Sequence, residues 1–170
     1  GSEMCISDRI NKVKIIFFDI DGTLLEMGKT EITPNMRKAL CSLKQNGIKI
    51  CIATGRPFVT IPMFEGVVFD AILAFNGSFC VAGEQVVAKC PIPKEDVKKI
   101  IENAKRMERP VSIATAEEIV ANGSDKDLED YFAIAHHRVN VSEKFEEYVE
   151  KDVFQIMLGC DLEERKYILE

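Results

Sequence analysis

The pattern of apolar and polar residues in the first half of the chain predicts a strand, a helix and a second strand. Residues 13–19 and 48–53 hold apolar runs with the length and β-branched content of buried parallel strands. Between them, apolar residues recur at helical spacing, after a Thr33-Pro34 start signal and before Gly47, which is typical of a helix end. We expect this unit to be a right-handed crossover between parallel strands.

Two further features extend the predicted sheet. A short apolar run at 71–75 predicts a third strand. Residues 79–82 and 85–89 flank Gly83-Glu84, which is a good signal for a β-hairpin. The first half of the chain therefore indicates an α/β unit with its parallel strands followed by a hairpin.

From Pro91 onward the pattern changes and predicts a smaller α+β unit. Pro91 and Pro93 mark a linker. We expect helices at 94–108, at 126–135 and near 143–150, strands at 111–115, 117–121 and 153–158, and a last helix capped by Asp161. The chain is therefore predicted to hold two domains, residues 1–90 and residues 91–170.

Composition limits the classes of function. The 170 residues include 28 acidic and 22 basic side chains, a net charge of −6, which argues against a general nucleic-acid or anionic-membrane binder. No apolar stretch approaches membrane-spanning length. The six cysteines form no CxxC pair, so a reducing cytoplasm is the simplest setting. The sequence leaves the oligomeric state open.

The most informative segment is Asp19-Ile20-Asp21-Gly22-Thr23, at the end of the first predicted strand. Side chains two apart on an extended segment point the same way, so both carboxylates face one ligand at the carboxyl edge of the sheet, where open α/β sheets bind ligands. Gly22 allows the backbone to turn close to that ligand. An acidic turn is the alternative interpretation, since Asp and Gly are common turn formers.

Two more polar segments follow the next two strands. Thr54 ends the second strand, where its hydroxyl can hydrogen-bond a phosphoryl oxygen, and Gly55 allows a close backbone approach. Taken alone, this segment is explained better as a turn that ends the strand. Arg56 suits a contact with substrate or phosphate, and a surface salt bridge explains it equally well. Asn76-Gly77 follows the third strand at the same edge, although this dipeptide usually marks only a turn.

The order of these segments resembles the haloacid dehalogenase-like hydrolases. The Asp19–Thr23 segment is similar to their first motif and Ala53–Pro57 to their second, and the following Asn-Gly, hairpin and second domain resemble the Cof-type branch. The resemblance covers essentially the whole chain. It implies a Rossmann-like parallel-sheet core in residues 1–90 and an α+β cap domain in residues 91–170.

The resemblance also implies a mechanism and a cofactor. Asp19 is the expected nucleophile, which forms an aspartyl-phosphate, and Asp21 the expected general acid and base. Mg²⁺ is expected to bind a carboxylate oxygen of Asp19 and the backbone carbonyl of Asp21. The residues implied in binding phosphate or substrate are Gly22, Thr54, Gly55, Arg56 and Asn76.

The family pattern is incomplete in this sequence. The family has a lysine and further acidic metal ligands in core segments after the cap, and we find neither in a matching context. The predicted sheet is small as well. We therefore expect the chain to be truncated, its cap to be incomplete, and the 170 residues to be nearly inactive by themselves.

The leading function is a Mg²⁺-dependent phosphohydrolase of small phosphorylated metabolites. The resemblance favours sugar phosphates, with pyridoxal phosphate and flavin nucleotides as further options. A phosphomutase of the same superfamily and a non-catalytic phosphate-binding remnant are the alternatives. The sequence does not name the substrate.

Overall fold

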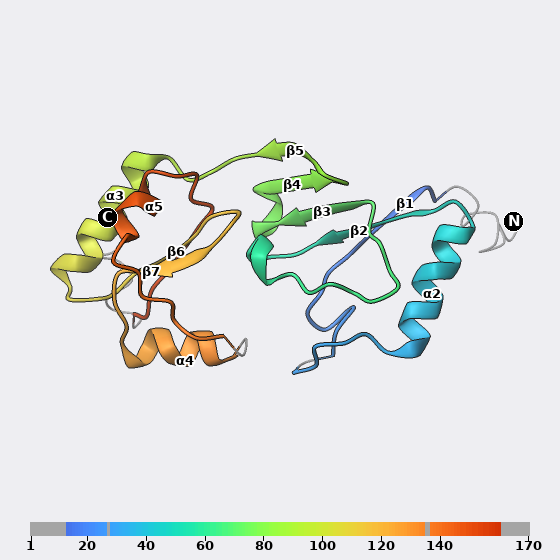
Figure 1. Ribbon diagram of the computed structural model, residues 1–170, viewed down its shortest axis with the longest axis horizontal. Coiled ribbons are helices and arrows are strands. Elements are labelled where there is room, and N and C mark those ends of the chain that lie inside the picture. The colour runs from blue at the N-terminus through green and yellow to red at the C-terminus, as the bar shows by residue number, and fades with distance from the viewer. Residues whose placement is uncertain (1–12, 27, 135–136, 161–170) are drawn as a thin grey trace, which may run out of the picture. The chain divides into compact units, whose positions relative to one another are not determined.

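The computed structural model describes residues 13–26, 28–134 and 137–160 (Figure 1). The chain divides into two compact units. The first comprises Gly1–Arg56 and Pro62–Ala88, and the second comprises Pro57–Ile61 and Lys89–Glu170. Two sheets are present in the described residues, one of five strands and one of three.

The first unit is built on the five-stranded sheet, in the order β1-β2-β3-β4-β5 (Figure 1). β1, β2 and β3 are parallel to one another, and β4 is antiparallel to β3. The predicted parallel strands and the hairpin are thus confirmed, and the first three strands are shorter than predicted. The strands are β1 (Ile15–Phe18), β2 (Lys49–Ala53), β3 (Ala71–Ala74), β4 (Phe79–Ala82) and β5 (Gln85–Lys89).

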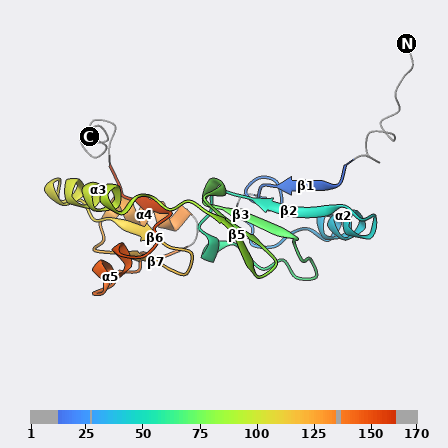
Figure 2. The same cartoon turned by 90° about the horizontal axis from the view of Figure 1, so that it is seen from above.

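Helix α2 (Pro34–Gln45) connects β1 to β2 and packs against β2 (Figure 2). The Thr33 hydroxyl oxygen accepts a hydrogen bond from the Met36 N–H at 3.1 Å, which satisfies one of the free N–H groups of the first turn. Gly47, with φ 74, follows the helix. The predicted start and end signals of this helix are therefore confirmed.

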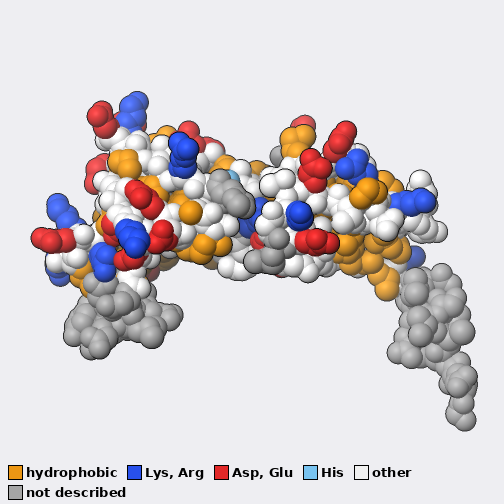
Figure 3. Space-filling view, turned by 90° about the horizontal axis from the view of Figure 1, so that it is seen from below, with side chains coloured by type: hydrophobic (Ala, Val, Ile, Leu, Met, Phe, Trp, Pro, Cys, Tyr) orange, Lys and Arg blue, Asp and Glu red, His pale blue; other side chains and the backbone are white. Residues whose placement is uncertain are grey.

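The core of the first unit lies on β2, where Ile50, Cys51 and Ile52 are at most 1% exposed. β2 is thus buried on both faces, as expected of a strand between parallel neighbours. β1 stands at the edge of the sheet, and Ile15 and Phe17 remain 45% and 50% exposed. Figure 3 shows hydrophobic side chains gathered on this unit, and basic and acidic side chains mixed over the viewed face.

Asp70 accepts two hydrogen bonds at the end of the sheet where β2 begins. Its Oδ2 accepts a hydrogen bond from the Ile50 N–H at 3.0 Å and another from the Lys44 Nζ at 3.2 Å. The Asp70 N–H in turn donates to the Ile50 carbonyl oxygen at 2.8 Å. One carboxylate therefore connects the segment before β3 to α2 and β2.

The second unit packs helices on a three-stranded antiparallel sheet, in the order β7-β6-β8. One core cluster gathers side chains of α3, α5 and the sheet, among them Val97, Ile113 and Phe145. All six predicted elements are present in slightly shorter form, and the predicted helix after Asp161 lies outside the described residues. The elements are α3 (Lys94–Arg106), β6 (Ser112–Ala114), β7 (Ile119–Ala121), α4 (Lys126–Ile134), α5 (Phe145–Val149) and β8 (Gln155–Met157).

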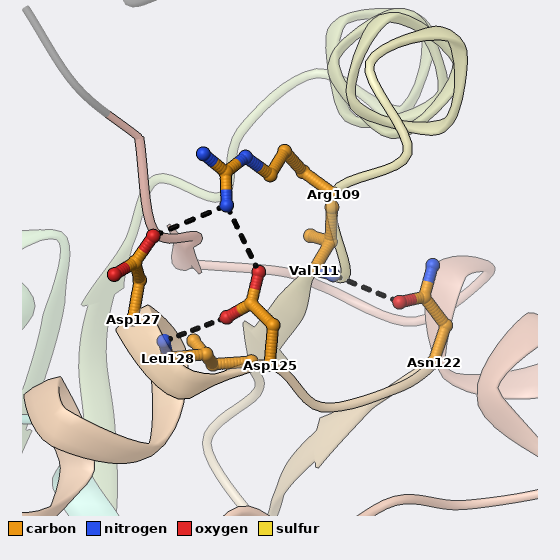
Figure 4. Close-up of polar contacts among 6 residues, drawn as sticks. All are labelled: Arg109, Val111, Asn122, Asp125, Asp127 and Leu128. Carbon is orange, nitrogen blue, oxygen red and sulfur yellow. Dashed lines mark hydrogen bonds and ion pairs between the residues drawn. The ribbon is translucent and has the colours of Figure 1, made fainter.

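An arginine and two aspartates fasten the start of α4 (Figure 4). The Arg109 Nη1 lies 3.4 Å from Asp125 Oδ2 and 3.1 Å from Asp127 Oδ2. The other Asp125 oxygen accepts the Leu128 N–H at 2.8 Å, which caps the helix. A Cβ on Gly159 would lie 2.3 Å from the Asp127 Cβ, so this corner is closely packed.

No helix in the described part of the chain is long and apolar enough to cross a membrane.

Candidate active site

The segment after β1 turns so that its carboxylates face outward. Asp19 and Asp21 are exposed, whereas Ile20 between them is fully buried. The Leu25 N–H donates to the Ile20 carbonyl at 2.9 Å, and the Gly22 N–H donates to the Leu25 carbonyl at 2.8 Å. Gly22 has φ 77, a left-handed conformation that glycine adopts without cost. Burial of Ile20 thus fixes the direction of both carboxylates.

Arg56 binds Asp21 through two parallel hydrogen bonds. The Arg56 Nε donates to Asp21 Oδ2 at 2.8 Å and the Arg56 Nη2 donates to Asp21 Oδ1 at 2.6 Å. This fork-shaped pairing is the strong geometry for arginine and carboxylate. Both side chains keep access to solvent, with 49% of Asp21 and 29% of Arg56 exposed. The sequence left Arg56 open between a ligand contact and a surface salt bridge, and its partner in the structure is a predicted catalytic residue.

The pair changes the acidity of both groups. The hydrogen bond from Arg56 is the largest cause that lowers the pKa of Asp21, and the positive charge of Arg56 adds to it against the effect of burial. The hydrogen bond to Asp21 raises the pKa of Arg56, and the charges of Asp21 and Asp19 act in the same direction. The negative charges of both aspartates after β1 therefore act on the Arg56 guanidinium.

Thr54 lies beside this pair at the end of β2. Its side chain is 5% exposed, and its N–H donates to the Leu73 carbonyl at 2.9 Å. The Thr54 Oγ1 accepts the Arg56 N–H at 3.2 Å. Within the described part of the chain, the Thr54 hydroxyl has no acceptor for its own proton. This hydroxyl is therefore available to donate to a bound anion.

The turn after β3, η2 (Phe75–Gly77), is joined to the end of β2. The Asn76 N–H donates to the Thr54 carbonyl at 3.0 Å, and the Phe75 N–H donates to the Arg56 carbonyl at 3.1 Å. A Cβ built on Gly55 would lie 3.0 Å from Asn76 Oδ1, so the Asn76 amide rests on Gly55. Asn76 is thus part of the same group of residues as Thr54 and Arg56.

The structure therefore brings most of the sequence-predicted residues into direct contact. One chain of contacts joins Asp21, Arg56, Thr54, Gly55 and Asn76. Asp19 follows β1, and parallel pairing of β1 with β2 places it at the same edge of the sheet. Gly22 lies in the turn beside it. These contacts describe the arrangement of the predicted residues, and their roles stay predictions.

The donors present fit a hard cation only in part. Carboxylate and carbonyl oxygens at Asp19 and Asp21 are the ligand types that Mg²⁺ prefers, with several waters completing its shell. No group of three or more His, Cys, Asp or Glu side chains within the described ranges could hold a metal ion. Asp19 and Asp21 therefore offer oxygen atoms of the kind that Mg²⁺ prefers, and their role as metal ligands stays a prediction.

Two features of this site were not predicted from the sequence. The paired hydrogen bonds between Arg56 and Asp21 join motifs far apart in sequence, and no local pattern signals them. The residue type of Phe75 also gives no indication of its left-handed backbone, with φ 50, because bulky residues rarely adopt that conformation. The Asn76-Gly77 dipeptide was the available signal, since both residue types favour left-handed turns.

Comparison with known proteins identifies the class to which this fold and site belong. A family model of the haloacid dehalogenase-like hydrolases matches residues 16–170, nearly the whole chain. The chain belongs to the haloacid dehalogenase-like hydrolase family.

Individual relatives agree with this assignment. The Bacillus subtilis (strain 168) protein named "Putative phosphatase YkrA" is 31% identical over 156 residues, 90% of this chain and 60% of that protein. The structure of the phosphatase BT1666 from Bacteroides thetaiotaomicron matches with a TM-score of 0.81 and 28% identity, over 97% of this chain and 62% of that chain. The structure of BT4131, named a subclass IIB sugar phosphatase, matches with a TM-score of 0.73 and 30% identity, over 92% of this chain and 62% of that chain.

The resemblance to the Cof-type branch that the sequence predicted is thereby confirmed. This chain spans about three fifths of the length of these relatives.

Proposed function

We propose that this chain carries the nucleophile and the anion-binding loop of a Mg²⁺-dependent phosphatase for small phosphorylated metabolites. The observation that supports it most is the contact between two motifs. The Asp21 carboxylate of the first motif is held by Arg56 of the second, next to the Thr54 hydroxyl. Phosphoryl transfer needs a nucleophile, a group that carries a proton and hydrogen-bond donors to the phosphate. We assign these roles to Asp19, Asp21 and the loop that carries Thr54.

In the first step, an Asp19 carboxylate oxygen attacks phosphorus. The bond from phosphorus to the leaving oxygen breaks, and protonated Asp21 gives that oxygen its proton. In the second step, Asp21 removes a proton from a water molecule that attacks the aspartyl-phosphate. The water oxygen bonds to phosphorus as the bond from phosphorus to the Asp19 oxygen breaks, so that inorganic phosphate leaves, Asp19 is a carboxylate again and Asp21 is protonated again.

The paired hydrogen bonds from Arg56 lower the pKa of Asp21 and so further favour its ionised form. A carboxylate in this state cannot donate a proton. We therefore propose that Arg56 turns from Asp21 toward the anionic substrate when it binds, and that Asp21, now beside the negative charges of the phosphate and Asp19, takes up a proton from solvent. The flexible arginine stem, the exposed Asp21 and the partial exposure of Arg56 support this exchange.

The phosphoryl oxygens are proposed to receive hydrogen bonds from the Thr54 hydroxyl and from backbone N–H groups near Gly22 and Gly55. Asp19 and the backbone carbonyl of Asp21 would hold Mg²⁺, which when bound reduces repulsion between the carboxylate and the phosphate.

The name of BT4131 supports sugar phosphates as the substrate class. We further propose that residues 1–90 form the core domain and residues 91–170 the cap that selects the substrate. The cytoplasmic location and the low activity of the isolated 170 residues stay predictions. Comparison of the 170-residue chain with the full-length gene product tests the second of these.

The test uses the full-length gene product and an aryl phosphate, with and without Mg²⁺. We expect phosphate release only with Mg²⁺, and none above background for Asp19→Asn, because an amide is a far poorer nucleophile. Asp130→Asn, at an exposed position of α4, is the matched control and should keep full activity. Metal-independent release, or an active Asp19→Asn variant, contradicts the proposal. An isomerised sugar phosphate in place of free phosphate would identify a phosphomutase.

A further inference from the structure

The turn between β3 and β4 contains three consecutive residues with left-handed backbone. Phe75 has φ 50, Asn76 has φ 56 and Gly77 has φ 91. Glycine adopts this conformation freely and asparagine tolerates it, whereas a phenylalanine there is a strained exception. A strained turn persists only where the surrounding structure holds it in place. The contacts that hold this turn in its strained conformation are therefore the observations to examine.

Two backbone hydrogen bonds and one buried ring hold the turn. The Phe75 N–H donates to the Arg56 carbonyl and the Asn76 N–H donates to the Thr54 carbonyl, at 3.1 and 3.0 Å. We call these two hydrogen bonds the loop clamp. The Phe75 side chain is 4% exposed, so its burial anchors the turn in the core. The loop clamp fastens the loop Thr54–Arg56 at both of its ends.

Gly55 lies between the two clamped carbonyl groups. A Cβ at this position would lie 3.0 Å from Oδ1 and 3.5 Å from Nδ2 of Asn76. The first distance is shorter than ordinary carbon–oxygen contact, so a side chain at position 55 must displace the Asn76 amide. A side chain at position 55 and the amide of Asn76 would therefore compete for the same space.

We propose that Asn76 is a positioning residue, which acts through the loop clamp to keep the loop Thr54–Arg56 in its anion-binding shape. In this role Asn76 does not touch the phosphoryl group. The conformation of its backbone matters, and its amide needs only the space above Gly55. The inference rests on the proposed function, because the clamped loop carries the Thr54 hydroxyl and Arg56, which are the proposed hydrogen-bond donors to the phosphate.

Two variants of Asn76 separate backbone from side chain, with the affinity for inorganic phosphate in the presence of Mg²⁺ as the readout. Asn76→Val disfavours the left-handed conformation, so phosphate should bind about tenfold more weakly. Asn76→Gly keeps that conformation, so the affinity should stay within about twofold of wild type while the melting temperature stays equal or rises. An affinity lost in Asn76→Gly would show that the amide itself binds the anion, and would overturn the proposal.

A double variant tests the dependence between the two positions. Gly55→Ala should weaken phosphate binding about tenfold, since its methyl group pushes against the Asn76 amide and so strains the clamped turn. Gly55→Ala combined with Asn76→Gly should restore the affinity, because the obstructing amide is gone. Failure of this rescue contradicts the proposal.

Glu108 is the matched control, since it is left-handed with φ 57 and lies after α3 in the second unit. Glu108→Val should lower the melting temperature much as Asn76→Val does and leave phosphate affinity unchanged. Equal losses of affinity in both variants would mean that general destabilisation is the cause, and the positioning role would be rejected.

Hydrogen exchange separates this inference from the proposed function. If the wild-type protein binds no phosphate, the proposed anion site is wrong. The loop clamp is then judged by exchange alone. The Phe75 and Asn76 amides should exchange at least about tenfold faster in Gly55→Ala and regain protection in the double variant. Unchanged protection in Gly55→Ala would overturn the clamp.

Discussion

Each unit of this chain contains an arginine paired with aspartate, and the two clusters are used differently. In the second unit, Arg109 contacts Asp125 and Asp127, and the second oxygen of Asp125 caps α4. In the first unit, both oxygens of Asp21 are bound by Arg56, and neither oxygen caps a helix. The first kind of cluster supports secondary structure, whereas the second is the one that we propose an anionic substrate opens.

The surroundings of the two clusters sharpen the contrast. Gly159 leaves no room beside Asp127, since a Cβ there would overlap its side chain. Asp21 instead keeps 49% of its surface exposed and shares an edge of the sheet with the Thr54 hydroxyl. Similar ion pairs therefore differ in the other contacts of their carboxylates. In the second unit the carboxylate of Asp125 also caps a helix, whereas Asp21 remains exposed beside the residues of the proposed site.

The largest expected effect is on catalysis. Asp21→Asn in the full-length gene product should lower kcat about 10²–10⁴-fold, because the leaving oxygen loses its proton donor. The melting temperature should change little, since Asp21 supports no helix. Steady-state kinetics with an aryl phosphate and thermal unfolding measure the two quantities. Asp127→Asn is the matched variant of the structural cluster and should keep kcat within about twofold. Equal loss of activity in both variants would remove the distinction.

The second prediction compares the two arginines. Arg56→Lys should raise KM for an aryl phosphate about tenfold, because lysine cannot reproduce the paired hydrogen bonds of guanidinium. Arg109→Lys should leave KM unchanged and lower the melting temperature slightly. If Arg56→Lys shows wild-type kinetics, Arg56 forms only a surface ion pair.

The third prediction concerns the stability of the second unit. Asp125→Ala removes the helix cap and one ion pair, so the free energy of unfolding should fall by about 1–2 kcal/mol. Asp127→Ala, which removes only a more exposed ion pair, should cost less than about 1 kcal/mol. Urea unfolding followed by circular dichroism measures both. The reverse order would show that the ion pairs outweigh the cap.

Much of the fold followed from local pattern. Alternation of apolar strands with an amphipathic helix, together with Thr33 and Gly47 at the helix ends, predicted α2 and its parallel neighbours. Short strands of the second unit were found because Gly and polar residues separate apolar runs. Strand ends were less accurate, since hydrogen bonding with neighbours decides the last residue of a strand.

The candidate site was predictable residue by residue, and its contacts were not. Motifs at strand ends identified Asp21, Thr54 and Arg56 because parallel strands bring their carboxyl ends together. The choice of Asp21 as the partner of Arg56 depends on side-chain geometry across two strands. The close approach of the Asn76 amide to Gly55 depends on how two separate turns meet, which sequence alone leaves open.

The smallest expected effect concerns Asp70, a structural carboxylate in the first unit. The hydrogen bond from the Ile50 N–H is the largest cause that lowers the pKa of Asp70, and Lys44 adds to it. A carboxyl group whose pKa is lower in the folded state stabilises the protein above its unfolded pKa of about 3.9. This contribution is lost as the pH falls through the folded pKa.

Asp70→Asn should therefore lower stability at neutral pH and reduce the further loss on acidification to about pH 3. Urea unfolding at both pH values, with the exposed Asp130→Asn as control, measures this difference. Because Asp70 lies where β2 begins, at the end of the sheet opposite Asp21, phosphate affinity should stay unchanged at neutral pH. If wild type and Asp70→Asn lose equal stability on acidification, the hydrogen bonds of Asp70 make no measurable contribution. A changed phosphate affinity would instead show that this end of the sheet influences the site, and the comparison of structural with functional carboxylates would then fail within the first unit itself.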